Sequence, residues 1–376
     1  MTGDVVQKPQ RIDALEGLRG IASAVVVVRH VFNSLDMPLD LRQKLSQILA
    51  PLINAQGAVQ LFFVLSGYVL ARSLSRGQGW LDLGQFYVKR VFRIYPPYVV
   101  AVLFAWCASF YYATPPDATP QEGTGLSAWF AEYAQVHLRP GQLLLSLGFP
   151  GSAFRQVPAG WTLTIEMAFS FALPLLFAIS RRFHWSVVVI ACAVALAAGV
   201  GAPLHYAMDF CLGIAIFLER ERIGRWMKLI PVWLSPIAIL GALAVFSAPQ
   251  LLNWSIPRAD ILICGFDPAS IGVMGIGSLG LISGAMFVPW LNRFLSVKPL
   301  MFLGRISFSL YLLHFPVLIL FAPLVSPPLD LGDGLTLLAA VLAISILISA
   351  FFFRWVERPS IRAGKLTCTW LSRRFG

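Results

Sequence analysis

Long apolar runs dominate this sequence, and charged residues interrupt them only briefly. Of its 376 residues, 57% are hydrophobic and 12% are charged, and the mean hydropathy is +0.74. A soluble domain carries about 25% charged residues, so this composition excludes a water-soluble globule. A helix that crosses a bilayer needs about 20 consecutive apolar residues. The chain is therefore predicted to be an all-α polytopic membrane protein with a single integral-membrane domain over residues 1–376.

The positions of the apolar runs predict about ten transmembrane helices. These lie near 18–35, 55–72, 94–112, 161–180, 184–200, 203–218, 231–248, 269–288, 306–324 and 335–353. Residues 113–160 form the longest segment outside the membrane, and two interpretations of it stay open. It is either a lid or re-entrant segment over an outward-facing cavity, or a solvated connector. Residues 354–376 form a basic tail.

The 29 Lys and Arg residues are distributed very unevenly. With the N-terminus inside, 23 of the 29 fall in cytoplasmic segments and Arg29 lies within a span. The remaining five lie in outer loops: Arg42, Lys44, Arg139, Arg155 and Arg258. This bias predicts that both termini are cytoplasmic, in a multi-pass protein of a bacterial inner or plasma membrane. The net charge of +11 then reflects the orientation of the chain in the membrane. The lipid bilayer is the expected partner, and nucleic acid is not expected to bind.

Ionisable residues within spans are costly, so each suggests a functional site. They are His30, Glu166, His205, Asp209 and His314. Arg19 and His30 are 11 residues apart, and a rotation of about 1100° places both on one helix face about 16 Å apart. This arrangement suits an anionic molecule that enters from inside, with proton chemistry deeper in the membrane. The alternative is a snorkelling arginine and a histidine hydrogen-bonded in the core. For His205 and Asp209, which are four residues apart, contacts between helices are the preferred interpretation.

Five motifs follow one another along the chain. They are Arg11-Ile-Asp-Ala-Leu-Glu-Gly-Leu-Arg-Gly-Ile-Ala followed by His30, Leu61-Phe-Phe-Val-Leu-Ser-Gly-Tyr68, Lys89-Arg-Val-Phe-Arg-Ile-Tyr-Pro-Pro97, Trp161-Thr-Leu-Thr-Ile-Glu166 and Gly304-Arg-Ile-Ser-Phe-Ser-Leu-Tyr-Leu-Leu-His314. In content and order they resemble the membrane-bound acyltransferase-3 family, whose members also have ten predicted spans. The sequence departs from the family wording at Thr162, where the family has serine, and the hydroxyl is kept.

The resemblance implies an O-acyltransferase. Such an enzyme moves an acyl group, commonly acetyl, from cytoplasmic acyl-CoA to a hydroxyl of a cell-envelope or exported glycan, or of a lipid-linked saccharide. Acetyl-CoA or another acyl-CoA is then the donor substrate, and no tightly bound cofactor is expected. No zinc motif or disulfide framework is visible among the five widely spaced cysteines, so no metal is expected either. Nothing in the sequence indicates an oligomeric state.

Several residues receive roles within this hypothesis. A sugar hydroxyl is a poor nucleophile near neutral pH, so a general base is required, and His30 is the candidate. Arg19, Arg90 and Arg93 are candidate clamps for the CoA phosphates, and their alternative is the ordinary positive-inside signal. Glu166 is expected to orient or polarise His30, or to bind the acceptor hydroxyl.

A polar stripe on the ninth span completes the candidate residues. Ser307, Tyr311 and His314 fall at i, i+4 and i+7, and together with Trp161 they either line the acyl pathway or hold helices together. Two alternative functions stay open. One is acylation of a small natural product such as a macrolide, and the other is a proton-coupled transporter that uses the buried Glu, Asp and His. The absence of a clear inverted repeat weighs against the transporter.

Overall fold

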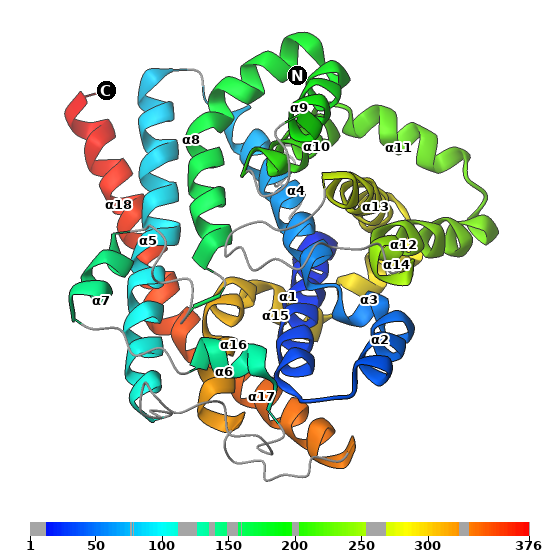
Figure 1. Cartoon of the computed structure of the whole chain (residues 1–376). Helices are drawn as coiled ribbons and strands as arrows, with labels where there is room; N and C mark the ends of the chain where they lie inside the picture. The colour runs from blue at the N-terminus through cyan, green and yellow to red at the C-terminus, as the bar shows by residue number, and fades with distance from the viewer. Residues whose placement is uncertain are drawn as a thin grey trace.

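The computed structural model describes residues 13–75, 77, 79–111, 126–134, 140–148, 157–158, 160–197, 203–252, 268–322 and 331–375. These residues are all-helical apart from turns and one isolated antiparallel bridge between Leu35 and Leu126 (Figure 1). The elements are α1 (Asp13–Ser34), α2 (Leu39–Ile48), α3 (Ala50–Ile53), α4 (Ala55–Leu74), α5 (Trp80–Tyr111), α6 (Ala128–Ala134), α7 (Pro140–Leu147), α8 (Gly160–Phe183), α9 (Trp185–Ala197), η2 (Pro203–Tyr206), α10 (Ala207–Leu218), α11 (Arg220–Leu229), η3 (Val232–Leu234), α12 (Ser235–Leu251), α13 (Pro268–Phe287), α14 (Pro289–Leu295), α15 (Lys298–Arg305), α16 (Ser307–Phe321), α17 (Leu331–Phe352), η5 (Phe353–Glu357) and α18 (Arg358–Phe375).

Each apolar run that predicted a span contains a helix. Among the described residues, six helices are long and apolar enough to cross a membrane, and the bent pair α15–α16 makes seven if it is one span. The helices at 185–197 and 204–218 are apolar but shorter. The total of ten spans and the cytoplasmic position of both termini therefore stay predictions.

Helix α1 is the central element of the bundle. It packs against α4, α13, α15, α16 and α17, and its apolar residues join one large core with those of α4, α5, α8 and α10. Asp13, Glu16, Arg19 and Arg29 make α1 too polar to face lipid by composition. Because other helices surround it, its polar residues meet protein groups and not hydrocarbon, which is how a bilayer tolerates them.

Small residues allow α1 to approach α14 and α15 backbone to backbone. A Cβ atom at Gly304 would overlap the carbonyl oxygen of Glu16, and one at Gly17 would overlap that of Leu295. At Gly20, a Cβ would lie 2.7 Å from the backbone nitrogen of Gly304. Glycine at these positions is thus a packing requirement, as is common where membrane helices touch closely.

The third span differs from the prediction at its inner end. The helix begins at Trp80, not near residue 94, and continues without a break to Tyr111 through Pro96 and Pro97. The basic stretch around Arg90 is therefore helical and inside the bundle. The sequence placed these charges at the end of a span because it does not reveal the carboxylates that face them.

The basic tail is also structured. After the π-helical turn η5 (Phe353–Glu357), helix α18 continues to Phe375 and packs along α5 (Figure 1). A π-turn shifts the register of a helix and often occurs at functional sites. It buries Glu357, the only acidic residue among the six Lys and Arg of residues 354–376.

The ninth span starts with a sharp bend that was not predicted. Helices α15 and α16 meet at an angle of 72°, at the cap residue Ile306. With 15 residues, α16 is about 22 Å long, shorter than the bilayer core of about 30 Å.

Parts of the predicted outer segment 113–160 are described. Helix α6 packs against α1, and Tyr98 and Tyr95 of α5 donate hydrogen bonds to carbonyl oxygens of Ser146 and Leu147 in α7, at 2.9 and 3.0 Å. Residues 112–125, 135–139, 149–156 and 159 lie outside the described residues. A lid role for the whole segment therefore stays a prediction.

We expect Gly304→Ala to destabilise the protein, because the added Cβ overlaps the backbone of α1 and overpacking typically costs about 1–3 kcal/mol. Thermal unfolding of the purified protein in detergent measures this effect. The matched control is Gly272→Ala in α13, where a Cβ would meet nothing within 4 Å. Equal melting temperatures for the two variants would contradict the close α1–α15 contact.

Candidate functional site

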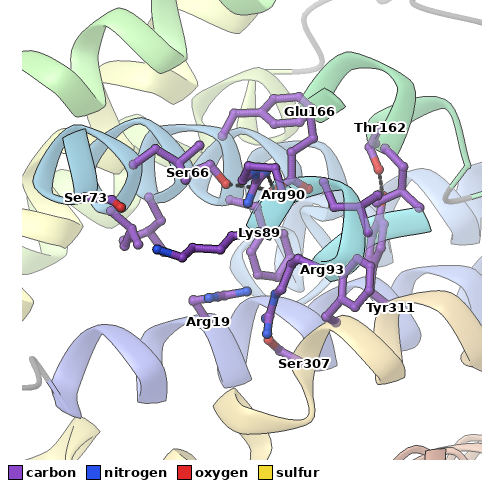
Figure 2. Close-up of a pocket in the computed structure, with 18 of the residues that line it drawn as sticks. Arg19, Ser66, Ser73, Lys89, Arg90, Arg93, Thr162, Glu166, Ser307 and Tyr311 are labelled. Atoms are coloured by element: carbon purple, nitrogen blue, oxygen red, sulfur yellow. Dashed lines mark hydrogen bonds and ion pairs between the residues drawn. The ribbon is translucent and has the colours of Figure 1, made fainter. Parts of the chain in front are cut away.

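A cavity of about 440 Å³ lies where α1, α4, α5, α8, α16 and α18 meet. We call it the basic cavity, because its charged lining is mostly cationic (Figure 2). Two acidic side chains, Glu16 and Glu166, line it against five basic ones, which are Arg19, Lys89, Arg90, Arg93 and Lys365. Such a lining attracts an anion, since like charges that converge in a protected cavity focus the field.

Glu166 holds Arg90 at the cavity wall. An Arg90 Nη2 to Glu166 Oε1 distance of 2.7 Å forms a salt bridge between α5 and α8, and Arg90 Nε donates a second bond to Ser170 Oγ at 3.0 Å. Ser66 Oγ of α4 donates to the same carboxylate oxygen at 3.3 Å. Glu166 therefore contacts arginine and serine in the structure and not His30, while the alternative that it binds the acceptor hydroxyl stays a prediction.

A second carboxylate holds Arg93 from the opposite side. Arg93 Nη1 lies 3.0 Å from Glu357 Oε1, and Ser309 Oγ of α16 donates to Glu357 Oε2 at 2.6 Å. The Glu357 side chain is fully buried, whereas that of Arg93 is 31% exposed and stands over the Phe308 ring. Removing one partner of a buried ion pair typically costs about 3–5 kcal/mol, so this contact fixes Arg93 firmly.

Arg19 differs from these two arginines. Its side chain lines the basic cavity, and among the described residues no group hydrogen-bonds or ion-pairs with its guanidinium. Figure 2 shows it directed into the space between Lys89 and Arg93. Glu166 and Glu357 are engaged by Arg90 and Arg93. Glu16, one turn earlier on α1, forms no direct ion pair with Arg19 among the described residues, so the Arg19 guanidinium can bind a ligand directly.

A neutral hydrogen bond crosses one wall of the cavity. Thr162 Oγ1 of α8 and Tyr311 Oη of α16 lie 2.9 Å apart, and both residues line the cavity (Figure 2). Ser307, one turn earlier in α16, lines it as well. Trp161 packs on Tyr206 instead, with ring centroids 5.7 Å apart, so this motif reaches the cavity through Thr162, Leu163 and Glu166 and not through Trp161.

His30 lies outside the cavity lining, in a pair with His314. The His30 Nδ1 and His314 Nε2 atoms are 2.7 Å apart, and the two rings are tilted by only 14°. His314 is one helical turn beyond Tyr311, and the centroids of those two rings are 6.2 Å apart. The histidine pair therefore lies between α1 and α16, about one helical turn along α16 from the Thr162–Tyr311 hydrogen bond.

The hydrogen bonds of the pair fix its tautomers. His314 Nδ1 lies 3.0 Å from the carbonyl oxygen of Leu310, which can only accept, so this nitrogen carries the proton. In neutral His314 the Nε2 atom is then an acceptor, and His30 Nδ1–H donates to it. The remaining nitrogen of His30, Nε2, keeps its lone pair. The geometry thus makes His30 a base whose ring is oriented by a second histidine.

Helix α6 covers this histidine pair. The Trp129 ring is stacked on His30, with centroids 5.7 Å apart and an interplanar angle of 5°. Ser127 attaches the segment to the end of α1, donating its backbone N–H to Ser34 O at 2.8 Å and its hydroxyl to Asn33 O at 2.6 Å. Within residues 113–160, helix α6 therefore lies over His30, whereas α7 packs on α5.

The site residues proposed from sequence thus form two groups. Arg19, Arg90, Arg93 and Glu166, with Ser307 and Tyr311, line the basic cavity, while His30 and His314 form the pair beyond it. The sequence hypothesis missed Glu357, Lys365 and Trp129. A single carboxylate in a basic tail was a signal that would have identified Glu357.

Comparisons with known proteins agree with this arrangement. A family model described as an acyltransferase domain matches residues 12–354. The chain is 27% identical over 382 residues to acyltransferase MdmB of Streptomyces mycarofaciens, an alignment that covers 94% of this chain and 92% of that protein. It is 35% identical over 96 residues to protein 2 in the picA locus of Rhizobium radiobacter, covering 25% of this chain and 44% of that protein. No solved structure matches the chain.

The family model and the long relative both favour acyl transfer over proton-coupled transport. Since the model spans nearly the whole sequence, the chain belongs to the membrane-bound acyltransferase-3 family.

Proposed function

We propose that this protein is an acyl-CoA-dependent O-acetyltransferase of the cell membrane, which transfers the acetyl group to a hydroxyl of a cell-envelope or exported glycan. The observation that carries the proposal is the arrangement on α1. One end of this helix presents Arg19 to a cavity lined with cations, and the same helix presents His30, further along, whose Nε2 atom has no hydrogen-bond partner among the described residues. Anion binding and proton removal are the two tasks that this reaction requires.

The chemistry follows from the free Nε2 atom of His30. This nitrogen takes the proton of the acceptor hydroxyl while the oxygen attacks the thioester carbonyl carbon. The new C–O bond forms, the C–S bond breaks, and the proton passes from His30 to the departing CoA sulfur. His314 supports the cationic stage, because its Nε2 atom accepts the hydrogen bond from His30 Nδ1–H, at 2.7 Å, and this bond strengthens when His30 is charged.

The basic cavity is the proposed site for the anionic part of the donor. Acyl-CoA carries phosphates, and Arg19, Lys89 and Lys365 present cationic groups to the cavity. Arg90 and Arg93 contribute charge from positions fixed by their carboxylate partners. The proposed donor pathway runs from the basic cavity to His30. The phosphates stay in the cavity, and the thioester arm extends along α1 past the Thr162–Tyr311 wall.

Substitution of His30 tests the general base. We expect His30→Ala and His30→Gln to lower turnover by about 10²–10⁴, the usual contribution of a positioned base, with the protein still folded. The measurement is CoA release from acetyl-CoA in the presence of acceptor. His184→Asn is the matched control, because His184 is exposed and pairs with Glu219 at 2.8 Å. Turnover near that of the control in a folded His30 variant would remove His30 from the mechanism.

Substitution of Arg19 tests the donor site. A hydrogen bond to a charged group contributes about 1.5–3 kcal/mol, so Arg19→Gln should raise the KM for acyl-CoA about tenfold or more and affect the acceptor less. The control is Arg182→Gln at the exposed end of α8. The double substitution Arg90→Ala with Arg93→Ala is also expected to raise this KM, but it leaves Glu166 and Glu357 without partners. An unchanged KM for acyl-CoA in Arg19→Gln would indicate that Arg19 only follows the positive-inside bias and does not bind the donor.

Sidedness tests the transmembrane pathway. Acyl-CoA should be accepted only from the face that bears Lys89 and Arg72, and the acylated product should appear on the other side. Sealed vesicles of known orientation, supplied with acyl-CoA on one side at a time, measure this directly. Equal activity from the side of Arg42 and Lys44, or product confined to the CoA side, would contradict the transmembrane pathway and leave acyl transfer intact.

Comparing O-acylated glycans and small molecules in cells with and without the chain distinguishes a glycan acceptor from a natural product.

A further inference from the structure

A second cavity, of about 1140 Å³, lies at the ends of α4, α11, α13 and α14. We call it the interfacial cavity. Five basic side chains from three helices line it, and these are Arg72, Arg220, Arg225, Lys228 and Arg293. The acyl-transfer proposal uses none of them. All five belong to segments that the charge bias predicts to be cytoplasmic.

The positive charge of this cavity is only partly compensated by protein groups. Asp13 and Glu221 are its two acidic lining residues, and Glu221 pairs loosely with Arg220 at 3.7 Å, with 79% of its side chain exposed. Within the described residues, no side chain forms a hydrogen bond or salt bridge with Arg225, Lys228 or Arg293. Cations from separate helices that converge in this way repel one another, so an anion bound between them is stabilising.

The wall of the cavity is apolar and aromatic. Phe217, Met286 and Phe287 contribute to it, and the Arg220 guanidinium lies over the Phe217 ring at 4.7 Å. A Cβ at Gly224 would lie 2.9 Å from the Phe287 ring, so α11 packs closely against the end of α13. A ligand with both an anionic group and apolar chains matches a cavity with these two kinds of wall.

Helix α11 and the turn after it indicate the depth of the cavity. Trp226, Leu229, Val232 and Trp233 are between 52% and 79% exposed. Exposed tryptophan beside basic residues on a short amphipathic helix is typical of the membrane interface, where the indole lies at headgroup level. The interfacial cavity therefore opens where lipid phosphates are concentrated.

We propose that the interfacial cavity binds the phosphate headgroup of an anionic phospholipid, with the acyl chains against its apolar wall. Basic pockets between transmembrane helices on the cytoplasmic side suit such headgroups. The lipid bridges α4, α11 and α14. This inference does not rest on the proposed function, because it concerns a separate cavity and a ligand that is not consumed.

Native mass spectrometry in neutral detergent tests the proposal, with phosphatidylglycerol and phosphatidylcholine as probes. The test variant combines Arg225→Gln, Lys228→Gln and Arg293→Gln. The matched control combines Arg222→Gln, Lys298→Gln and Arg305→Gln, which removes the same charge from residues of the same predicted side that do not line the cavity. Since each basic residue near an anionic surface contributes about fivefold in affinity, we expect phosphatidylglycerol binding to fall at least about tenfold in the test variant only.

Three results would overturn the proposal. The first is an equal loss in both triple variants, which indicates diffuse surface charge. The second is equal binding of phosphatidylcholine and phosphatidylglycerol to the unmodified protein, which indicates a site that does not distinguish an anionic headgroup from a zwitterionic one. The third is a raised KM for acyl-CoA with unchanged lipid binding, which assigns the cavity to the donor. If the triple variant does not fold, Lys228→Gln alone should lower phosphatidylglycerol binding about fivefold, and no loss would count against the site.

Discussion

The arrangement depends on holding arginines inside an apolar helix bundle. An unpaired charge within a bilayer is costly, so these residues are tolerated only where protein groups or a water-filled cavity receive them. Glu166 from α8 receives Arg90, and Glu357 from η5 receives Arg93. These ion pairs connect α5 to two separate helices and define the cavity between them. Arg19, on α1, adds charge that forms no direct ion pair with either carboxylate.

The position of α1 determines how this charge reaches the histidine pair. Gly304 lets α15 approach the backbone of α1, and directly after it the chain bends into α16, which also packs on α1. Two residues of α16 at successive turns then reach the two parts of the site: Tyr311 lies at the cavity, bonded to Thr162 of α8, and His314 lies against His30 of α1. The bend at Ile306 is therefore part of the site, since the α16 residues that follow it line the cavity and reach His30.

Relations within one helix could be predicted from the sequence, and relations between helices could not. The helical period correctly placed Arg90 and Arg93 on one cavity, because three residues nearly complete a turn. It carries no information on which helices adjoin, so the His30–His314 contact, 284 residues apart, and the Arg93–Glu357 salt bridge were not foreseen. The wrongly predicted start of the third span has the same cause. A basic stretch indicates the end of a span as long as its carboxylate partners on other helices are unknown.

The energetics of the contacts indicate which part of the site can open. On the proposed pathway, the thioester must pass the wall between the basic cavity and the histidine pair. A neutral hydrogen bond such as Thr162–Tyr311 contributes about 0.5–1.5 kcal/mol net, whereas leaving one member of a buried ion pair unpaired costs about 3–5 kcal/mol. Separation is therefore expected at the neutral pair, while Arg90–Glu166 and Arg93–Glu357 stay as the fixed frame.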